Sequence, residues 1–209
     1  MINLEIFKHR DFRPFDRFRE SAVLLLVQTV GDEKFLILEK RAMSMRSQPG
    51  DISFPGGRLE PGEEPAQAAL RETAEETGLA AHQIELIAAL EFYVTHFGAI
   101  LYPFVGRTNS EDFKPNPDEV EHLIRIPLEE LLAQEPEIFS RKIDPTPPDD
   151  FPYDRIQGGR NYNFSSIRVD EYFYRYEEHH IWGTTAKILH HFLNILKTSK
   201  DWEEPLTNS

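Results

Sequence analysis

Glu72, Glu75 and Glu76 stand at positions i, i+3 and i+4 of a segment with helical punctuation. Each helical residue is turned by about 100° from the last, so this spacing places the three carboxylates on one arc about 100° wide. Like charges held this close repel one another, and a divalent cation would relieve that repulsion. Mg²⁺ prefers oxygen ligands and is commonly shared between carboxylates and substrate phosphates. The spacing therefore indicates a divalent metal site, although a bare acidic run of this kind is more often a solvated helix face.

A helix between Pro65 and Gly78 is the element expected to position these carboxylates. Proline suits the first helical position, because its missing N–H would be unpaired there in any case. Glycine suits the end, because it tolerates the left-handed conformation that terminates many helices. The residues expected to form the packing face of this helix are Ala69, Leu70, Thr73 and Thr77.

The loop before this helix adds flexible backbone and a fourth carboxylate. Phe54-Pro55-Gly56-Gly57 allows a sharp turn and a close approach of the backbone to a neighbour. Glu63 lies just before the helix. Arg71, four residues before Glu75, can relieve part of the repulsion and fix a carboxylate rotamer, so it joins the candidate catalytic residues. The loop distinguishes this segment from an ordinary acidic helix.

Gly57 to Leu79 follow the pattern G-x5-E-x7-R-E-U-x-E-E-x-G-U, and on this pattern the chain resembles the Nudix hydrolase family. Of the two bulky aliphatic positions, Leu79 conforms and Thr73 does not. The resemblance implies an α/β fold, namely an α/β/α sandwich with a mixed β-sheet and a loop-helix-loop catalytic segment. It also implies hydrolysis of a nucleoside diphosphate derivative with Mg²⁺ or Mn²⁺. All seven fixed positions are present: Gly57, Glu63, Arg71, Glu72, Glu75, Glu76 and Gly78.

The resemblance assigns roles to these residues. Glu72 and Glu76 are expected to be direct metal ligands, with Glu75 a third ligand or the residue that activates water. The Gly57 carbonyl is expected to supply a further oxygen ligand. The metal ions would neutralise charge on the diphosphate and lower the pKa of the attacking water. The catalytic base stays open between Glu75 and the downstream Glu119.

A second pattern stands just upstream of the first. Arg41-Ala42-x3-Arg46-x3-Gly50-x3-Phe54-Pro55-Gly56-Gly57 resembles the signature of the coenzyme A diphosphatase branch of Nudix enzymes. Glu39 occupies a position where that branch usually has Thr. Further matches to this branch occur downstream, so the resemblance covers roughly residues 22–196. It implies cleavage of coenzyme A or a derivative to 4′-phosphopantetheine and adenosine 3′,5′-bisphosphate.

This substrate agrees with the chemistry of the upstream residues. Coenzyme A carries a diphosphate and a 3′-phosphate, and Arg41 and Arg46 offer planar, bidentate forks for phosphate oxygens. Gly56 and Gly57 are counted with them as candidate substrate-binding residues. Two alternatives stay open. Glu39 leaves room for another substrate, such as ADP-ribose, a nucleotide sugar or a dinucleotide. A non-catalytic ligand-sensing module is the other, although such modules usually lack one or more of the glutamates.

The remaining elements follow from hydrophobic pattern and turn residues. They should form an α/β sandwich around one mixed sheet. The expected strands are Ala22–Thr29, Lys34–Lys40, Ile84–Val94, Ala99–Val105, Val120–Ile126 and Ser165–Tyr176. The expected helices are Leu128–Leu132 and Thr184–Lys197, with an irregular loop at Asp144–Tyr162 and a frayed polar tail at Thr198–Ser209.

Length and composition narrow the class of protein. At 209 residues we expect a single domain spanning 1–209, with a lead-in at 1–20 and a tail at 198–209. The formal charge of −13 argues against sequence-independent nucleic-acid binding, so the expected partner is a small-molecule nucleotide. The absence of cysteine excludes disulfides and a thiol nucleophile. No apolar run is long enough for a membrane span or a secretory signal, which favours a cytoplasmic protein. The residues predict no oligomeric state, although members of the family are often homodimers.

Overall fold

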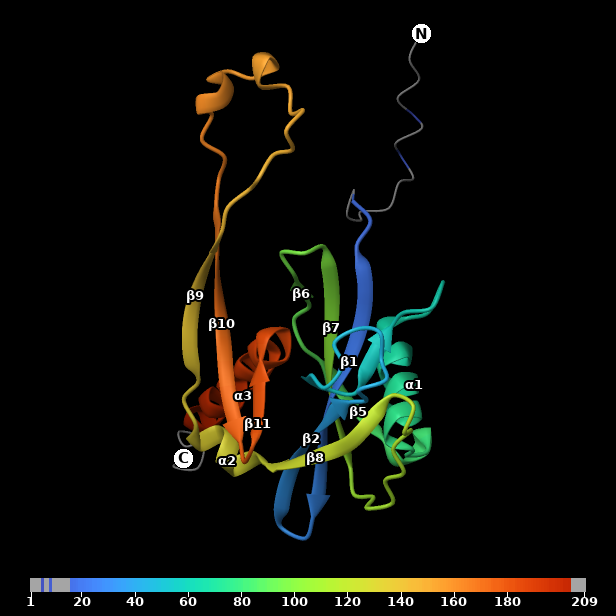
Figure 1. Ribbon diagram of the computed structural model, residues 1–209. Coiled ribbons are helices and arrows are strands. Elements are labelled where there is room, and N and C mark those ends of the chain that lie inside the picture. Colours follow the sequence, from blue (N-terminus) through green and yellow to red (C-terminus); the bar gives the residue numbers. More distant parts are fainter. Residues whose placement is uncertain (1–4, 6–7, 9–15, 204–209) are drawn as a thin grey trace.

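The computed structural model describes Glu5, Lys8 and residues 16–203, and within them the strands form two sheets (Figure 1). The larger sheet has eight strands, with the order β3-β2-β1-β7-β5 and with β4, β6 and β8 paired to β1, β7 and β2. These strands are β1 (Arg19–Val30), β2 (Glu33–Arg41), β3 (Ile52–Ser53), β4 (Gly56–Arg58), β5 (Glu85–Ala89), β6 (Tyr93–Val94), β7 (Ala99–Thr108) and β8 (Val120–Pro127).

The smaller sheet and the helices complete the fold. The smaller sheet has the order β11-β10-β9 and consists of β9 (Glu137–Ile143), β10 (Ile167–Tyr176) and β11 (His179–Trp182). The helices are α1 (Pro65–Thr77), α2 (Leu128–Ala133) and α3 (Gly183–Glu203). Short 3₁₀ turns are η2 (Ala81–Gln83), η3 (Tyr153–Arg155) and η4 (Gly159–Asn161).

The larger sheet is mixed, as predicted. β1 and β2 form an antiparallel hairpin around Gly31, whose φ of 60° is the left-handed conformation expected of a turn glycine. β1 and β7 run parallel, in register from Arg19 opposite Ala99 to Gln28 opposite Thr108. A strand with neighbours on both edges and helices on both faces must be apolar on both faces. This requirement explains the unbroken apolar run that begins at Ala22.

Helices α1 and α3 cover opposite faces of the larger sheet (Figure 1). Side chains alternate between the faces of a strand, so neighbours on β2 belong to different core clusters. Ile37 packs with Ala68 and Ala69 of α1. Leu36 and Leu38 pack with the cluster that holds the apolar face of α3. The predicted α/β/α sandwich is confirmed.

Helix α1 has the predicted ends. Pro65 occupies its first turn, and Gly78 ends it with a φ of 72° while its N–H donates to the Ala74 carbonyl oxygen. The predicted packing face is confirmed, because Ala69, Thr73 and Thr77 are buried and Leu70 packs partly buried against the same core. Ala68 and Glu76, which were not predicted, are buried as well. The buried face therefore contains a carboxylate of the catalytic segment.

Three other expectations about the fold were wrong. The strand expected at Ile84–Val94 is divided into β5 and β6. The second sheet was not foreseen, because β9 reads EIFSRKI and mixes apolar and charged residues without the alternation of a half-buried strand. The expected tail begins too early, because α3 continues to Glu203. Most of the lead-in and residues 204–209 lie outside the described residues.

The segment between β9 and β10 is irregular apart from η3 and η4, as its proline and glycine content predicts. With the two strands it forms a long arm that extends away from the larger sheet (Figure 1). Aromatic rings contact one another at its tip, among them Phe151 with Tyr153 and Phe164. No helix in the described part of the chain combines the length and apolarity needed to cross a membrane.

Candidate active site

The catalytic segment is fastened to the sheet through Glu76. The Gly56 N–H donates to Glu76 Oε2 at 2.7 Å, and the Glu76 side chain is almost completely buried. Gly56 has a φ of 149°, and a Cβ atom there would lie 2.3 Å from the Ala22 carbonyl oxygen. Only glycine allows β4 to approach β1 this closely. The strand pairing and the orientation of a predicted metal ligand thus depend on the same residue.

Gly57 leaves room for the second predicted ligand. A Cβ atom on Gly57 would lie 2.4 Å from Cδ of Glu72 and 2.5 to 2.6 Å from its carboxylate oxygens. The Glu72 carboxylate therefore rests against the backbone of Gly57. The glycine at this position of the pattern is explained by the space that the carboxylate needs.

Replacing Gly57 by Ala should displace the Glu72 carboxylate and lower kcat, with little change in melting temperature. The reason is that the clashing atoms are the end of a flexible side chain and not a strand or helix backbone. We expect a loss of at least about tenfold, as for other changes that move a metal ligand by its surroundings. Steady-state kinetics and thermal unfolding measured on the same preparation test this. Unchanged kcat would mean that the position of Glu72 is not set by Gly57.

Arg71 organises the carboxylates around it. Its guanidinium donates to both oxygens of Glu63 at 2.9 and 3.0 Å and to Glu72 Oε1 at 2.8 Å. Its contact with Glu75 is longer, at 3.5 Å, and it also donates to the Arg58 carbonyl oxygen. Arg71 thus joins the loop to the helix and holds Glu72 in one orientation. The prediction that it fixes a carboxylate rotamer agrees with these contacts, and the rotamer is that of Glu72.

The Arg71 fork, together with the Glu60 N–H, lowers the pKa of Glu63 from 4.5 to about 2. A carboxyl with a lowered pKa stabilises the folded state when it is ionised. Its contribution is therefore complete above about pH 4.5 and is lost as the pH falls towards 2. The melting temperature of Glu63→Gln should lie below that of the wild type at pH 6, and the difference should shrink on acidification. Calorimetry between pH 2 and 6 measures it, with Glu60→Gln as control. A constant difference would contradict the assignment.

The three glutamates of the helix are not equivalent. Glu72 and Glu76 point towards the Gly56-Gly57 backbone, whereas the Glu75 side chain is 55% exposed and makes a long contact with the Arg71 guanidinium. Glu119 precedes β8, and its charge acts on Glu72. Its backbone carbonyl oxygen accepts the Ala42 N–H. The structure therefore brings Glu119 to the same site from a distant part of the chain and places Glu75 on its outer side.

Burial raises the pKa of both Glu72 and Glu76. Arg71 opposes the effect at Glu72, while the carboxyl of Glu39 adds to it at Glu76. Buried carboxylates are unfavourable unless a positive charge accompanies them. Their oxygens are the ligand type that Mg²⁺ and Mn²⁺ prefer. The site thus fits a divalent cation, but among the described residues no three His, Asp or Glu side chains form a complete cluster of metal ligands.

Glu39 belongs to this site, which the sequence did not predict. Its side chain is fully buried, and Glu39 Oε1 accepts a hydrogen bond from Ser53 Oγ at 3.0 Å. Its charge also raises the pKa of Glu76. One feature of the sequence could have revealed it: Glu39 is a glutamate within the apolar strand KFLILEKR. It stands two residues after Ile37, so both side chains lie on the face of the strand that packs against α1. In the sequence, Glu39 stands out only as a departure from the coenzyme A diphosphatase pattern.

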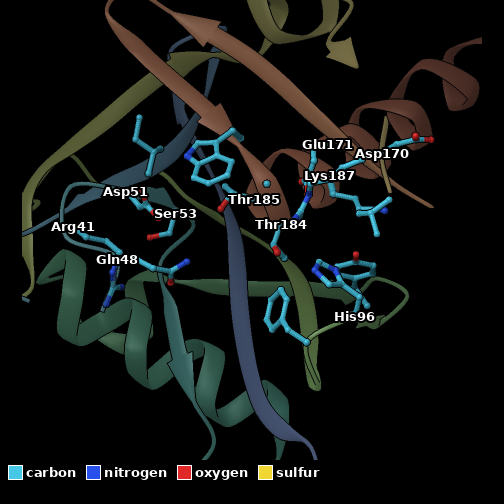
Figure 2. A pocket seen from close by; sticks show the side chains of 17 residues that line it. Arg41, Gln48, Asp51, Ser53, His96, Asp170, Glu171, Thr184, Thr185 and Lys187 are labelled. Carbon is cyan, nitrogen blue, oxygen red and sulfur yellow. The ribbon is translucent and has the colours of Figure 1, made fainter. Parts of the chain in front are cut away.

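A groove extends from this site across the end of the larger sheet. Two adjoining cavities, of about 460 and 290 Å³, form it and share Arg41, Ser53 and Thr184 in their walls. The first also reaches Gly56 and Gly57. The second also reaches the smaller sheet and the start of α3, with Arg141, Trp182 and Lys187 in its wall. Figure 2 shows Thr184, Thr185 and Lys187 across this space from Arg41, Gln48 and Ser53.

The two arginines of the upstream pattern lie in different surroundings. Arg41 is mostly buried and lines both cavities. Arg46 is exposed in the loop between β2 and β3 and lines neither. Only Arg41 is therefore placed to meet a ligand in the groove.

Comparison with known proteins gives one family. The family model described as NUDIX domain matches residues 18–146. Nudix hydrolase 3 of Caenorhabditis elegans is 29% identical over 182 residues, covering 84% of this chain and 72% of that protein. Nudix hydrolase NudL of Photorhabdus laumondii is 30% identical over 177 residues, covering 84% and 83%. Peroxisomal coenzyme A diphosphatase NUDT7 of Mus musculus is 32% identical over 123 residues, covering 58% of this chain and 51% of that protein.

Proposed function

We propose that this chain, which belongs to the Nudix hydrolase family, cleaves the diphosphate bond of coenzyme A or one of its derivatives. Membership of the family makes it a hydrolase of substrates that contain a diphosphate. The choice of coenzyme A rests on one observation, which is the groove that leads from Gly56 and Gly57, against which Glu76 and Glu72 lie, past Arg41 to the start of α3. The expected products are 4′-phosphopantetheine and adenosine 3′,5′-bisphosphate.

The groove suits a long anion with a second phosphate. Arg41 lines both of its cavities, and Lys187 lines the one farther from the glutamates. The aromatic side chains of Phe97 and Trp182 border the same space and offer flat surfaces to an adenine ring or a pantetheine arm. The carboxylate of Glu171 on the far wall is already paired with Arg141 at 2.7 Å. Arg41 and Lys187 line the same space and offer positive charge to a 3′-phosphate.

The mouse relative supports the same choice. That protein is named as a coenzyme A diphosphatase, and the similar region covers about half of its length. The groove draws on the chain from Arg19 to Ile188, and one core cluster joins β2 to α3. These features support the proposal that residues 1–209 act as a single domain.

The protein side of the mechanism follows from the contacts at the site. Glu72 and Glu76 would hold a divalent cation, with the Gly57 carbonyl as a further ligand. Arg71 keeps Glu72 oriented, and the Gly56 N–H does the same for Glu76. A bound Mg²⁺ or Mn²⁺ supplies positive charge for the diphosphate and lowers the pKa of water. Glu119 and Glu75 remain the candidates that accept a proton from the attacking water.

Product analysis tests the proposal directly. The pure protein with Mg²⁺ or Mn²⁺ is incubated with coenzyme A, dephospho-coenzyme A, ADP-ribose, a nucleotide sugar and a diadenosine polyphosphate. Coenzyme A should be the best substrate, and mass spectrometry should identify the two products named above. Faster cleavage of ADP-ribose or of a dinucleotide would overturn coenzyme A as substrate while leaving diphosphate hydrolysis in place. Reaction in ¹⁸O-labelled water identifies the phosphorus that is attacked.

A further inference from the structure

The buried position of Glu39 needs an explanation, because nothing in the family pattern requires a carboxylate there. Glu39 lies on β2 and faces α1, as Ile37 does. Its side chain has no exposed area. Removing a carboxylate from water costs several kcal/mol unless charges and hydrogen bonds compensate for it.

The compensation that the protein provides is incomplete. Glu39 Oε1 accepts the Ser53 hydroxyl at 3.0 Å and lies 3.8 Å from Nη1 of Arg41. Glu39 Oε2 has no hydrogen-bond partner. Four buried side-chain atoms of the described residues are without partners, and two of them, Glu39 Oε2 and Arg41 Nε, belong to these neighbouring residues. One oxygen of Glu39 is therefore buried with its lone pairs unused.

The charge of Glu39 acts on the carboxyl group of Glu76, a predicted metal ligand. Glu76 Oε2 already accepts the Gly56 N–H. Two buried carboxylates near each other repel strongly unless a positive charge lies between them.

We propose that Glu39 and Glu76 ligate the same divalent cation, which makes Glu39 a further metal ligand of this enzyme. This inference rests on the proposed metal-dependent hydrolysis. Two carboxylates per ion is a usual number for Mg²⁺, whose other positions are taken by water and by substrate phosphates. Arg41 contacts Glu39 and lines the groove. Glu39 consequently connects the residue that faces the substrate to the metal.

The test is the affinity for Mn²⁺ without substrate, measured by calorimetry and by the electron paramagnetic resonance signal of free Mn²⁺. Glu39→Gln keeps the shape of the side chain and an acceptor for Ser53 but removes the charged ligand. Its Mn²⁺ affinity should fall by at least about tenfold. The matched control is Glu121→Gln, which removes one charge from the neighbouring strand β8, where Glu121 pairs with Lys40 at the surface. That variant should bind Mn²⁺ as the wild type does.

Thermal unfolding separates metal binding from a structural role. In EDTA, Glu39→Gln should melt at or above the wild-type temperature, because it removes one of two buried like charges. With Mn²⁺, the wild type should gain more stability than the variant. Glu39→Thr, a smaller side chain that keeps a hydroxyl, should show the same loss of Mn²⁺ affinity if Glu39→Gln does not fold.

Wild-type affinity for Mn²⁺ in folded Glu39→Gln or Glu39→Thr would overturn the inference and assign the pair to sharing a proton. Failure of the wild type to bind Mn²⁺ at all would overturn metal-dependent hydrolysis as well. Failure of coenzyme A as a substrate would leave the result for Glu39 unaffected, because the measurement contains no substrate. Affinities of the Glu39→Gln, Glu76→Gln and double variants should not be additive, since one cation uses both ligands.

Discussion

Replacing Glu72 or Glu76 by Gln should lower kcat by about 10³-fold or more, which corresponds to roughly 4 kcal/mol of lost transition-state stabilisation. The fold should survive both changes. In Glu76→Gln the amide oxygen can still accept the Gly56 N–H, and the amide nitrogen can donate to Glu39. This variant should therefore melt no lower than the wild type in EDTA. Steady-state kinetics with Mg²⁺ and thermal unfolding measure the two effects.

Variants at the other carboxylates complete this experiment. Glu121→Gln serves as the control, because it removes a charge from the surface outside the site. Glu75→Gln and Glu119→Gln distinguish the two candidates for the base, since only loss of the base should remove the limb of the pH–rate profile that requires a deprotonated group. Turnover close to that of the wild type in both Glu72→Gln and Glu76→Gln would refute the metal assignment.

Replacing Arg41 by Ala should lower kcat/KM for coenzyme A by about 10- to 100-fold more than for dephospho-coenzyme A, which lacks the 3′-phosphate. A hydrogen-bonded charge pair of roughly 1.5 to 3 kcal/mol accounts for a difference of this size. Arg41 also contacts Glu39, so part of its loss will affect every substrate. The ratio between these two substrates removes that common part.

Arg46→Ala is the matched comparison. The sequence predicted both arginines as phosphate ligands, whereas the structure places Arg46 outside both cavities of the groove. We therefore expect Arg46→Ala to change the ratio of kcat/KM between the two substrates much less than Arg41→Ala does. Equal losses on both substrates in Arg41→Ala would argue against recognition of the 3′-phosphate.

The catalytic helix could be predicted from the sequence because everything that defines it is local. Pro65 and Gly78 determine its ends through their own backbone geometry, and the spacing of Glu72 and Glu76 places both on one face. The apolar run from Ala22 likewise predicts a strand buried on both faces. Local conformational preferences and side-chain periodicity act within a few residues, so a single sequence is sufficient to detect them.

The smaller sheet illustrates where this approach fails. The strand at β10 was predicted, but its partner β9 was not, because the side chains of β9 do not alternate clearly between apolar and charged. Pairing between distant segments depends on which strand becomes the neighbour, which periodicity within one segment does not specify. The sheet matters for function, because Arg141 and Trp182 belong to the wall of the groove.

The segment from Gly57 to Leu79 shows what the sequence by itself determined: the helix, its carboxylates and, through the pattern, the family and its chemistry. Only the tertiary structure decided which carboxylates share a buried site. It brought Glu39 of β2 against Glu76 of α1 and left Glu75 at the surface. It also separated Arg41 from Arg46. The physical reason is that side chains become buried, and like charges come close, when separate elements pack together. The spacing of residues along the chain does not specify which elements will pack together.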